Sequence, residues 1–258
     1  KGQMAPLIKE AEKLLLDFPN SLSLFKILGA AHANLKNYDI SIENYEKAIK
    51  LKPDYAEGYF KLGIIYFTRG DNEKALEYFE QNIRINPNNA DVFNNLGLIL
   101  YQNGEYSAAM KNYEEALKIK PDLFEAYNNI GNVFIAQKKF KTALEYYEKA
   151  LNFSPQNIDL KYNIAVSYQN LGDTKNAIKS YKECLEIQPN NVKIQFNLAQ
   201  SYKKAGDIDK ALEHYQSVLD LKSESISAHN NMGLIYTELG QTKSALNCFN
   251  EALKIKPD

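Results

Sequence analysis

The sequence predicts an all-α solenoid built from stacked helix-turn-helix repeats. A short motif returns every 34 residues, as in Asn94-Asn95-Leu96-Gly97 and Asn128-Asn129-Ile130-Gly131. Prolines follow the same interval at Pro19, Pro53, Pro87, Pro121, Pro155 and Pro189, and after a break at Ser223 the series resumes at Pro257. Between these landmarks apolar residues recur at steps of three and four, which is the pattern of amphipathic helices. Helical patterning at one fixed period of this length is typical of stacked helical hairpins.

Residues 1–21 read as the second half of a repeat whose first helix is absent, because Leu7, Ile8, Ala11, Leu14 and Leu15 share one helical face. Seven repeats are expected to follow. Their boundaries are 22–55, 56–89, 90–123, 124–157, 158–191, 192–225 and 226–258. Each proline ends the second helix of a repeat, because proline cannot continue a helix and biases its predecessor away from helical angles.

Small residues recur at two places of the repeat. Glycines that suit the positive φ of a helix stop separate the two helices at Gly70, Gly104, Gly172, Gly206 and Gly240, whereas Lys36 and Lys138 replace glycine in the other two repeats. A second series lies where a side chain would hold the paired helices apart: Gly29, Gly63, Gly97, Gly131, Ala165, Ala199 and Gly233. A large residue there would cost ~1–3 kcal/mol by overpacking.

These landmarks resemble the tetratricopeptide repeat family, whose pattern is an aromatic residue, Leu-Gly, Tyr, and later Ala, an aromatic residue, Ala and Pro. The third repeat carries this pattern as Phe93, Leu96, Gly97, Leu100, Ala109, Tyr113, Ala116 and Pro121. Departures include Lys161 and Gln195 for the opening aromatic residue and Asn82 for a buried alanine. The resemblance covers residues 22–258. It implies a right-handed superhelix with the first helices on its concave surface.

Composition narrows the possible functions. The formal net charge is −1, and lysines alternate with acids along most of the chain, which argues against nucleic-acid binding. No apolar run is long enough for a membrane span. The two cysteines, Cys184 and Cys248, give no disulfide framework, and a reducing, cytoplasmic location is expected. The three histidines occupy unrelated places, and no metal-ligand, phosphate-loop or nucleophile motif occurs. We therefore expect no cofactor and no enzymatic activity.

The strongest functional indication is a column of asparagines that the repeat framework does not require: Asn95, Asn129, Asn163, Asn197 and Asn231. At ~100° per residue each of them points away from the core of its repeat. An amide offers both a donor and an acceptor, so a row of amides can pair with the backbone of an extended peptide. The alternative is that these asparagines bond to neighbouring repeats and set the pitch of the stack.

Further candidates for peptide contact lie beside this column. They are Asn94, Asn128, Tyr162, Phe196 and Asn230, each one residue earlier, and Tyr101, one turn further on. Aromatic side chains here could grip apolar side chains of a peptide. Helix-to-helix packing is the alternative for each of them. The asparagine column also resembles the repeat region of O-linked N-acetylglucosamine transferases, where such a ladder binds the backbone of protein substrates.

The sequence therefore predicts a non-enzymatic protein-interaction scaffold that binds an extended segment of a partner protein in its concave groove. Two alternatives stay open. The chain could be the substrate-recognition arm of a larger modifying enzyme such as a glycosyltransferase, or a scaffold that self-assembles into homo-oligomers through uncapped ends.

Overall fold

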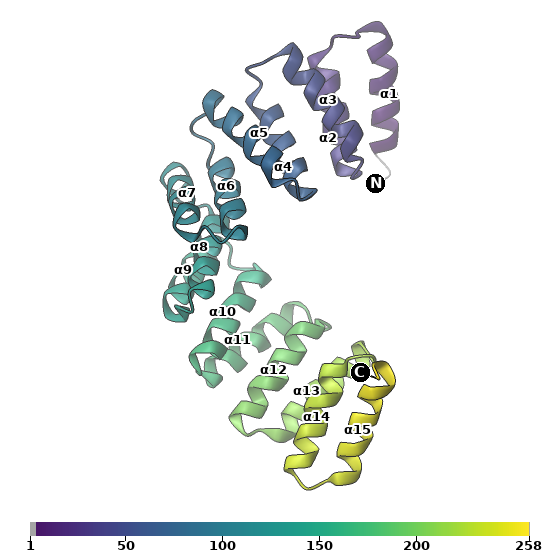
Figure 1. The fold of residues 1–258 in the computed structure, drawn as a ribbon, viewed down its shortest axis with the longest axis vertical. Coiled ribbons are helices and arrows are strands. Elements are labelled where there is room, and N and C mark those ends of the chain that lie inside the picture. Colours follow the sequence, from purple (N-terminus) through teal and green to yellow (C-terminus); the bar gives the residue numbers. More distant parts are fainter. Residues whose placement is uncertain (1–3, 258) are drawn as a thin grey trace. The chain divides into compact units, whose positions relative to one another are not determined.

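The computed structural model describes residues 4–257, which form fifteen α-helices and no strand (Figure 1). The predicted all-α fold of helical repeats is confirmed. By its internal contacts the chain divides into two compact units, residues 1–126 (unit 1) and 127–258 (unit 2). Each unit is described by itself.

The helices alternate between first and second helices of the repeats. Unit 1 contains α1 (Met4–Asp17), α2 (Leu22–Asn34), α3 (Tyr38–Leu51), α4 (Ala56–Thr68), α5 (Asn72–Ile85), α6 (Ala90–Gln102), α7 (Tyr106–Ile119) and the start of α8 (Phe124–Ala136). Unit 2 contains the rest of α8 and α9 (Phe140–Phe153), α10 (Ile158–Leu171), α11 (Thr174–Ile187), α12 (Val192–Ala205), α13 (Ile208–Leu221), α14 (Ile226–Glu238) and α15 (Thr242–Ile255). From α2 onward, even-numbered helices are first helices and odd-numbered helices are second helices.

In the five repeats that carry glycine at the small-residue position of the first helix, an aromatic ring of the second helix rests on that glycine. A Cβ atom added to Gly97 would lie 2.6 Å from the ring of Tyr113, and one added to Gly131 would lie 2.5 Å from the ring of Tyr147. Both distances are shorter than two carbon atoms tolerate. The prediction that small residues permit close helix pairing is therefore confirmed.

The turn between the two helices of each repeat contains one residue with left-handed backbone angles. The five glycines at these stops have φ between 71° and 82°. Lys36 and Lys138 adopt the same conformation with φ of 63° and 58°, although a Cβ atom disfavours it. The shape of the turn is thus set by the packing of the two helices and is kept even where the residue is unfavourable.

The hydrogen bonds of the Asn82 side chain explain why asparagine replaces alanine at this place of the repeat. Its side chain is fully buried in α5, where most other repeats place alanine, as at Ala116. The Asn82 Nδ2 donates to the Ala56 carbonyl oxygen at 2.6 Å, and its Oδ1 accepts from Asn89 Nδ2 at 3.1 Å. Asn89 also accepts the Val92 N–H at the start of α6. Asn82 therefore ties its own repeat to the first turn of the next.

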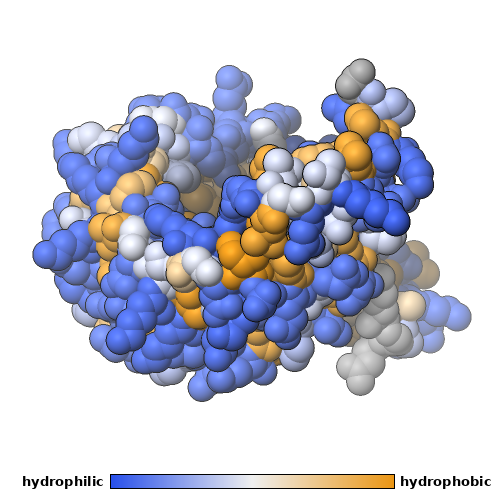
Figure 2. Space-filling model, turned by 90° about the horizontal axis from the view of Figure 1, so that it is seen from below, coloured by the Kyte–Doolittle hydropathy of each residue, from blue (hydrophilic) through white to orange (hydrophobic). Residues whose placement is uncertain are grey.

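Each unit has its own core of apolar side chains from adjacent repeats. In unit 1 one cluster centres on Tyr45, Leu62 and Phe79, and in unit 2 one centres on Leu198 and Tyr215. On the face seen in Figure 2, hydrophobic residues form bands bordered by hydrophilic ones. Among the described residues, no helix combines the length and the apolar character that crossing a bilayer requires.

Replacing Lys36 with glycine should stabilise unit 1. Glycine relieves the strain at φ 63°, and this outweighs the added freedom of the unfolded chain, so we expect the free energy of unfolding to rise by about 0.5–1 kcal/mol. Urea unfolding followed by circular dichroism measures the change. The matched control is Lys111→Gly, because Lys111 is exposed within α7, and the same substitution there should destabilise by about 0.5–1 kcal/mol. Equal effects of the two substitutions would contradict this account.

Replacing Asn82 with alanine should destabilise the protein, although alanine is the residue that the repeat pattern favours at this place. The substitution leaves the Ala56 carbonyl and the Asn89 amide without their buried partner, so we expect a loss of about 1–3 kcal/mol in urea unfolding. The control is Cys184→Ala at the equivalent place in α11, where a buried thiol is removed and the loss should be about 1 kcal/mol or less. An Asn82 variant as stable as this control would refute the tie between repeats.

Candidate peptide-binding surface

The first helices present two neighbouring columns of side chains. The sixth residue of α6, α8, α10, α12 and α14 forms the ladder column: Asn95, Asn129, Asn163, Asn197 and Asn231. The fifth residue forms the preceding column: Asn94, Asn128, Tyr162, Phe196 and Asn230. All of these side chains are half-buried except Asn230, which is exposed. None of these side chains is fully buried, so a ligand can reach both columns within each unit.

Two ladder amides of unit 2 bond to the preceding repeat. The Asn163 Nδ2 donates to the Asn128 Oδ1 at 3.0 Å, and the Asn197 Nδ2 donates to the Tyr162 hydroxyl at 2.7 Å. In both cases a ladder residue reaches the preceding column of the repeat before it. The alternative that these asparagines bond to neighbouring repeats therefore holds at these two positions.

Two other ladder amides bond within their own helix. The Asn95 Nδ2 donates to the Asp91 carbonyl oxygen, and the Asn231 Nδ2 donates to the Ser227 carbonyl oxygen, both at 2.7 Å. Asn94 and Asn129 also interact within the protein. Since an asparagine amide has two N–H groups and one carbonyl oxygen, each of these four bonds uses one part of this capacity.

The aromatic candidates pack onto second helices. The ring centroid of Tyr162 lies 6.0 Å from that of Tyr181, and the ring of Phe196 meets Tyr215 edge-on at 5.5 Å. Tyr101 packs against Tyr106 at 5.6 Å. The packing alternative therefore holds for one side of these rings, and the exposed remainder of each ring borders the columns.

A further set of amides lies on first helices of unit 2. The Asn132 Oδ1 accepts from the Tyr147 hydroxyl at 2.8 Å, and the Gln169 Oε1 accepts from the Tyr181 hydroxyl at 2.5 Å. The Gln169 Nε2 also donates to the Gln200 Oε1 at 3.5 Å. Asn132 and Gln200 were not among the residues predicted from the sequence. Both are the ninth residue of their repeats, a place where the fifth repeat has the apolar Val166, so the polar residues at this place could have pointed to them.

Lysine side chains make two kinds of contact on this structure, ion pairs with acids and contacts with aromatic rings. Lysines of second helices pair with nearby acids, as Lys118 does with Glu115 and Lys254 with Glu251. On α12, the Lys193 Nζ lies 4.3 Å from the ring centroid of Tyr162. This places a cation directly over an aromatic ring of the preceding column.

Burial shifts the pKa of two further titratable side chains, His214 and Cys184. The His214 Nδ1 lies 2.7 Å from the Gln195 Oε1 and the ring stacks on Tyr202, while burial lowers the pKa of His214. Burial raises the pKa of the Cys184 thiol to about 11, so the unreactive thiol form persists at neutral pH. In the part of the chain that the structure describes, no cluster of three or more His, Cys, Asp or Glu side chains could hold a metal ion.

Comparisons with known proteins agree on the type of repeat. A model described as a TPR repeat matches residues 29–68, 64–104 and 97–137, and models of tetratricopeptide repeats match residues 124–157 and 156–224. A model described as YpiA-like, C-terminal tetratricopeptide repeats matches residues 193–258. Together these matches extend without a gap from residue 29 to residue 258.

One curated relative is the small glutamine-rich tetratricopeptide repeat-containing protein 2 of Saccharomyces cerevisiae. It is 36% identical over 66 residues, which are 26% of this chain and 18% of that protein, so the chain matches under a fifth of its length. The resemblance of the ladder column to glycosyltransferase repeat regions stays a prediction.

Solved structures with the same fold include YrrB, described as a TPR protein with an unusual peptide-binding site. YrrB is 26% identical, with a TM-score of 0.60 over 70% of this chain and 93% of its own. The pilF protein of Pseudomonas aeruginosa is 22% identical, with a TM-score of 0.70 over 85% of this chain and 96% of its own, and this likeness concerns the fold alone. From its repeats, its helix pairs and these matches, the chain belongs to the tetratricopeptide repeat family.

Proposed function

We propose that this protein binds an extended segment of a partner protein along the ladder and preceding columns of its first helices. The fold itself is that of a protein-interaction scaffold. The single observation that carries the finer proposal is the ladder column, in which half-buried amides recur at one place of five successive first helices. A peptide backbone carries one donor and one acceptor per residue, and an amide side chain can satisfy both.

The bonds between repeats support this role, because they hold the amides in fixed positions before a ligand arrives. In unit 2 the Asn128 and Tyr162 side chains orient Asn163 and Asn197, respectively. The bond to Asn128 leaves an N–H group and the carbonyl oxygen of the Asn163 amide for a ligand, whereas the Asn197 side chain also bonds to Tyr181. Side chains that are already ordered lose less conformational entropy on binding, so preorganised amides bind a peptide more tightly than mobile ones.

We expect the affinity for an extended peptide to be modest and to depend little on the sequence of the peptide. Each neutral hydrogen bond contributes about 0.5–1.5 kcal/mol, and the ladder has few rungs. The exposed edges of Tyr162 and Phe196 add apolar contact and a preference for particular side chains. YrrB, whose description names a peptide-binding site, is a relative in fold that supports peptide recognition by this kind of repeat.

The test is a screen of unstructured peptides against the protein and against a variant with Asn129, Asn163 and Asn197 all replaced by alanine. Loss of three bonds should weaken a bound peptide by roughly 10-fold to 1000-fold, measured by fluorescence anisotropy. The matched control replaces Asn152, Asn247 and Asn250, which are exposed on second helices, and should leave affinity unchanged. Undiminished affinity in the ladder variant would refute the proposal.

A second variant separates ligand contact from support of the stack. Tyr162→Phe removes the hydroxyl that accepts from Asn197 but keeps every ladder amide. If the amides contact the ligand, this variant should bind at most a few-fold more weakly than the unmodified protein. If it loses binding as completely as the triple variant, the amides act through the stacking of repeats and direct contact is excluded.

Self-assembly is a second candidate, favoured by apolar side chains on α1 and α15. Leu246 and Leu253 of α15 are 57% and 52% exposed, whereas their equivalents Leu212 and Leu219 pack against a core cluster. On α1, Leu7 and Leu14 are exposed, while Leu15 packs near α2.

Association through α15 predicts a molecular mass by light scattering that rises with concentration and falls back to one chain in a Leu246→Glu, Leu253→Glu variant. Replacement of the exposed Leu171 by glutamate is the matched control and should leave the mass unchanged. A single chain at every concentration would contradict self-assembly.

A further inference from the structure

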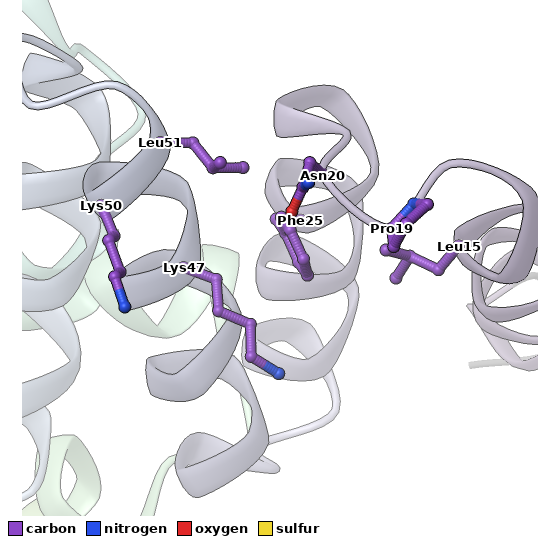
Figure 3. A pocket seen from close by; sticks show the side chains of 7 residues that line it. All are labelled: Leu15, Pro19, Asn20, Phe25, Lys47, Lys50 and Leu51. Carbon is purple, nitrogen blue, oxygen red and sulfur yellow. The ribbon is translucent and has the colours of Figure 1, made fainter.

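A cleft lined by none of the ladder or preceding-column residues lies between the leading helix and the first repeat. The cleft has a volume of about 570 Å³ and lies in unit 1, where the loop from α1 to α2 faces the end of α3. Figure 3 shows Leu15 and Pro19 on one side, Lys47, Lys50 and Leu51 on the other, and Asn20 with Phe25 between them. A cleft of this size can hold a few side chains of a ligand.

The floor of the cleft is apolar. Phe25 is 7% exposed and belongs to a cluster with Ala48 and Tyr55, against which Leu15 also packs. Leu51 is 43% exposed at the end of α3. An apolar side chain that enters between Leu15, Phe25 and Leu51 would remove this surface from water, which favours binding.

The rim of the cleft is cationic. The Lys47 Nζ pairs with Glu43 at 2.7 Å and lies 5.7 Å from the ring centroid of Phe25. Lys50 is exposed in the last turn of α3 and forms no ion pair with the described residues. Asp17, on the α1 side, lines a hollow that shares Pro19 and Asn20 with the cleft. The rim therefore favours a ligand with a negative charge close to its apolar group.

The other repeats provide an internal comparison, because the same helical positions recur at the repeat interval. The residues equivalent to Lys47 and Lys50 are Gln81 and Arg84, Glu115 and Lys118, Lys149 and Asn152, Glu183 and Glu186, Ser217 and Asp220, and Glu251 and Lys254. A pair of lysines occurs in the first repeat alone. In the fourth repeat, the residue equivalent to Leu51 is Phe153, whose ring stacks on Tyr127 at 5.8 Å. The smaller Leu51 leaves corresponding space beside Phe25.

We propose that this cleft binds an acidic, apolar segment of a partner polypeptide, with an apolar side chain on the Leu15–Phe25–Leu51 floor and an adjacent carboxylate at Lys47 and Lys50. The Asn20 amide at the mouth can pair with the peptide backbone. The cleft is thus a second recognition site, distinct in residues and in chemistry from the neutral amides of the ladder column.

The test uses the whole chain and a dye-labelled peptide, capped at both ends, in which one phenylalanine stands between two glutamates. We expect saturable binding by anisotropy that weakens as salt rises, and weaker binding of two matched peptides, one with lysines for the glutamates and one with alanine for the phenylalanine. Lack of binding at about 1 mM protein, or equal binding of all three peptides, would overturn the proposal.

Two variants and a control locate the site. Lys50→Glu should weaken binding of the glutamate peptide about 10-fold or more, while Lys118→Glu, the same charge change at the equivalent place of the third repeat, should leave it within about twofold. Leu51→Phe fills the space as Phe153 does and should weaken binding with every charge retained. The ladder variant should bind this peptide normally, which separates the two sites. If neither Lys50→Glu nor Leu51→Phe exceeds the control, the cleft is not the site.

A second copy of the chain is the competing occupant. Sedimentation velocity of the protein alone should show the same mass before and after Lys50→Glu. A concentration-dependent dimer that disappears in this variant would assign the cleft to self-association and overturn the peptide proposal.

Discussion

The rest of the structure depends on the contact, made in five repeats, between an aromatic ring of the second helix and a glycine of the first helix. The ring of Tyr113 rests on Gly97 and the ring of Tyr147 on Gly131, so closely that no Cβ atom fits between them. This contact sets the distance between the paired helices and also their rotation. Because the ladder residue stands two positions before the small residue, it points about 200° away around the helix. The packing of the core therefore places the amides on the opposite face.

The ladder amides have a structural role in addition to the proposed binding role. In unit 2, the bonds from Asn163 to Asn128 and from Asn197 to Tyr162 connect successive first helices. Bonds of this kind stabilise the stacking of neighbouring repeats, and they also restrict the side chains that a ligand would meet. One set of residues can serve both purposes, because an amide has more donors and acceptors than one bond uses. Stacking and binding would then be coupled, and ligand binding should stabilise unit 2.

Much of the fold could be predicted from the sequence, because the period, the prolines and the small residues each follow from a local backbone or packing constraint. Lys36 and Lys138 were correctly placed at helix stops although neither residue favours left-handed backbone. The pairing of Asn82 with Ala56 and Asn89 could not be predicted, since it joins separate segments of one repeat that meet only after its two helices have packed together. The hydrogen-bond partners of Asn163 and Asn197 could not be predicted either, because they depend on the side-chain rotamers adopted in the stacked repeats. The cleft beside Phe25 likewise requires three separate segments to come together.

The most direct test of the central claim is to observe the side-chain amide signals of the ladder asparagines by nuclear magnetic resonance during titration with a bound peptide. The account predicts that the Nδ2 signals of Asn129, Asn163 and Asn197 shift in a saturable way, with smaller changes for exposed asparagines of second helices such as Asn152 and Asn250. Peptide binding that leaves the ladder signals unmoved while others shift would show that the amides only join the repeats, and would contradict the account.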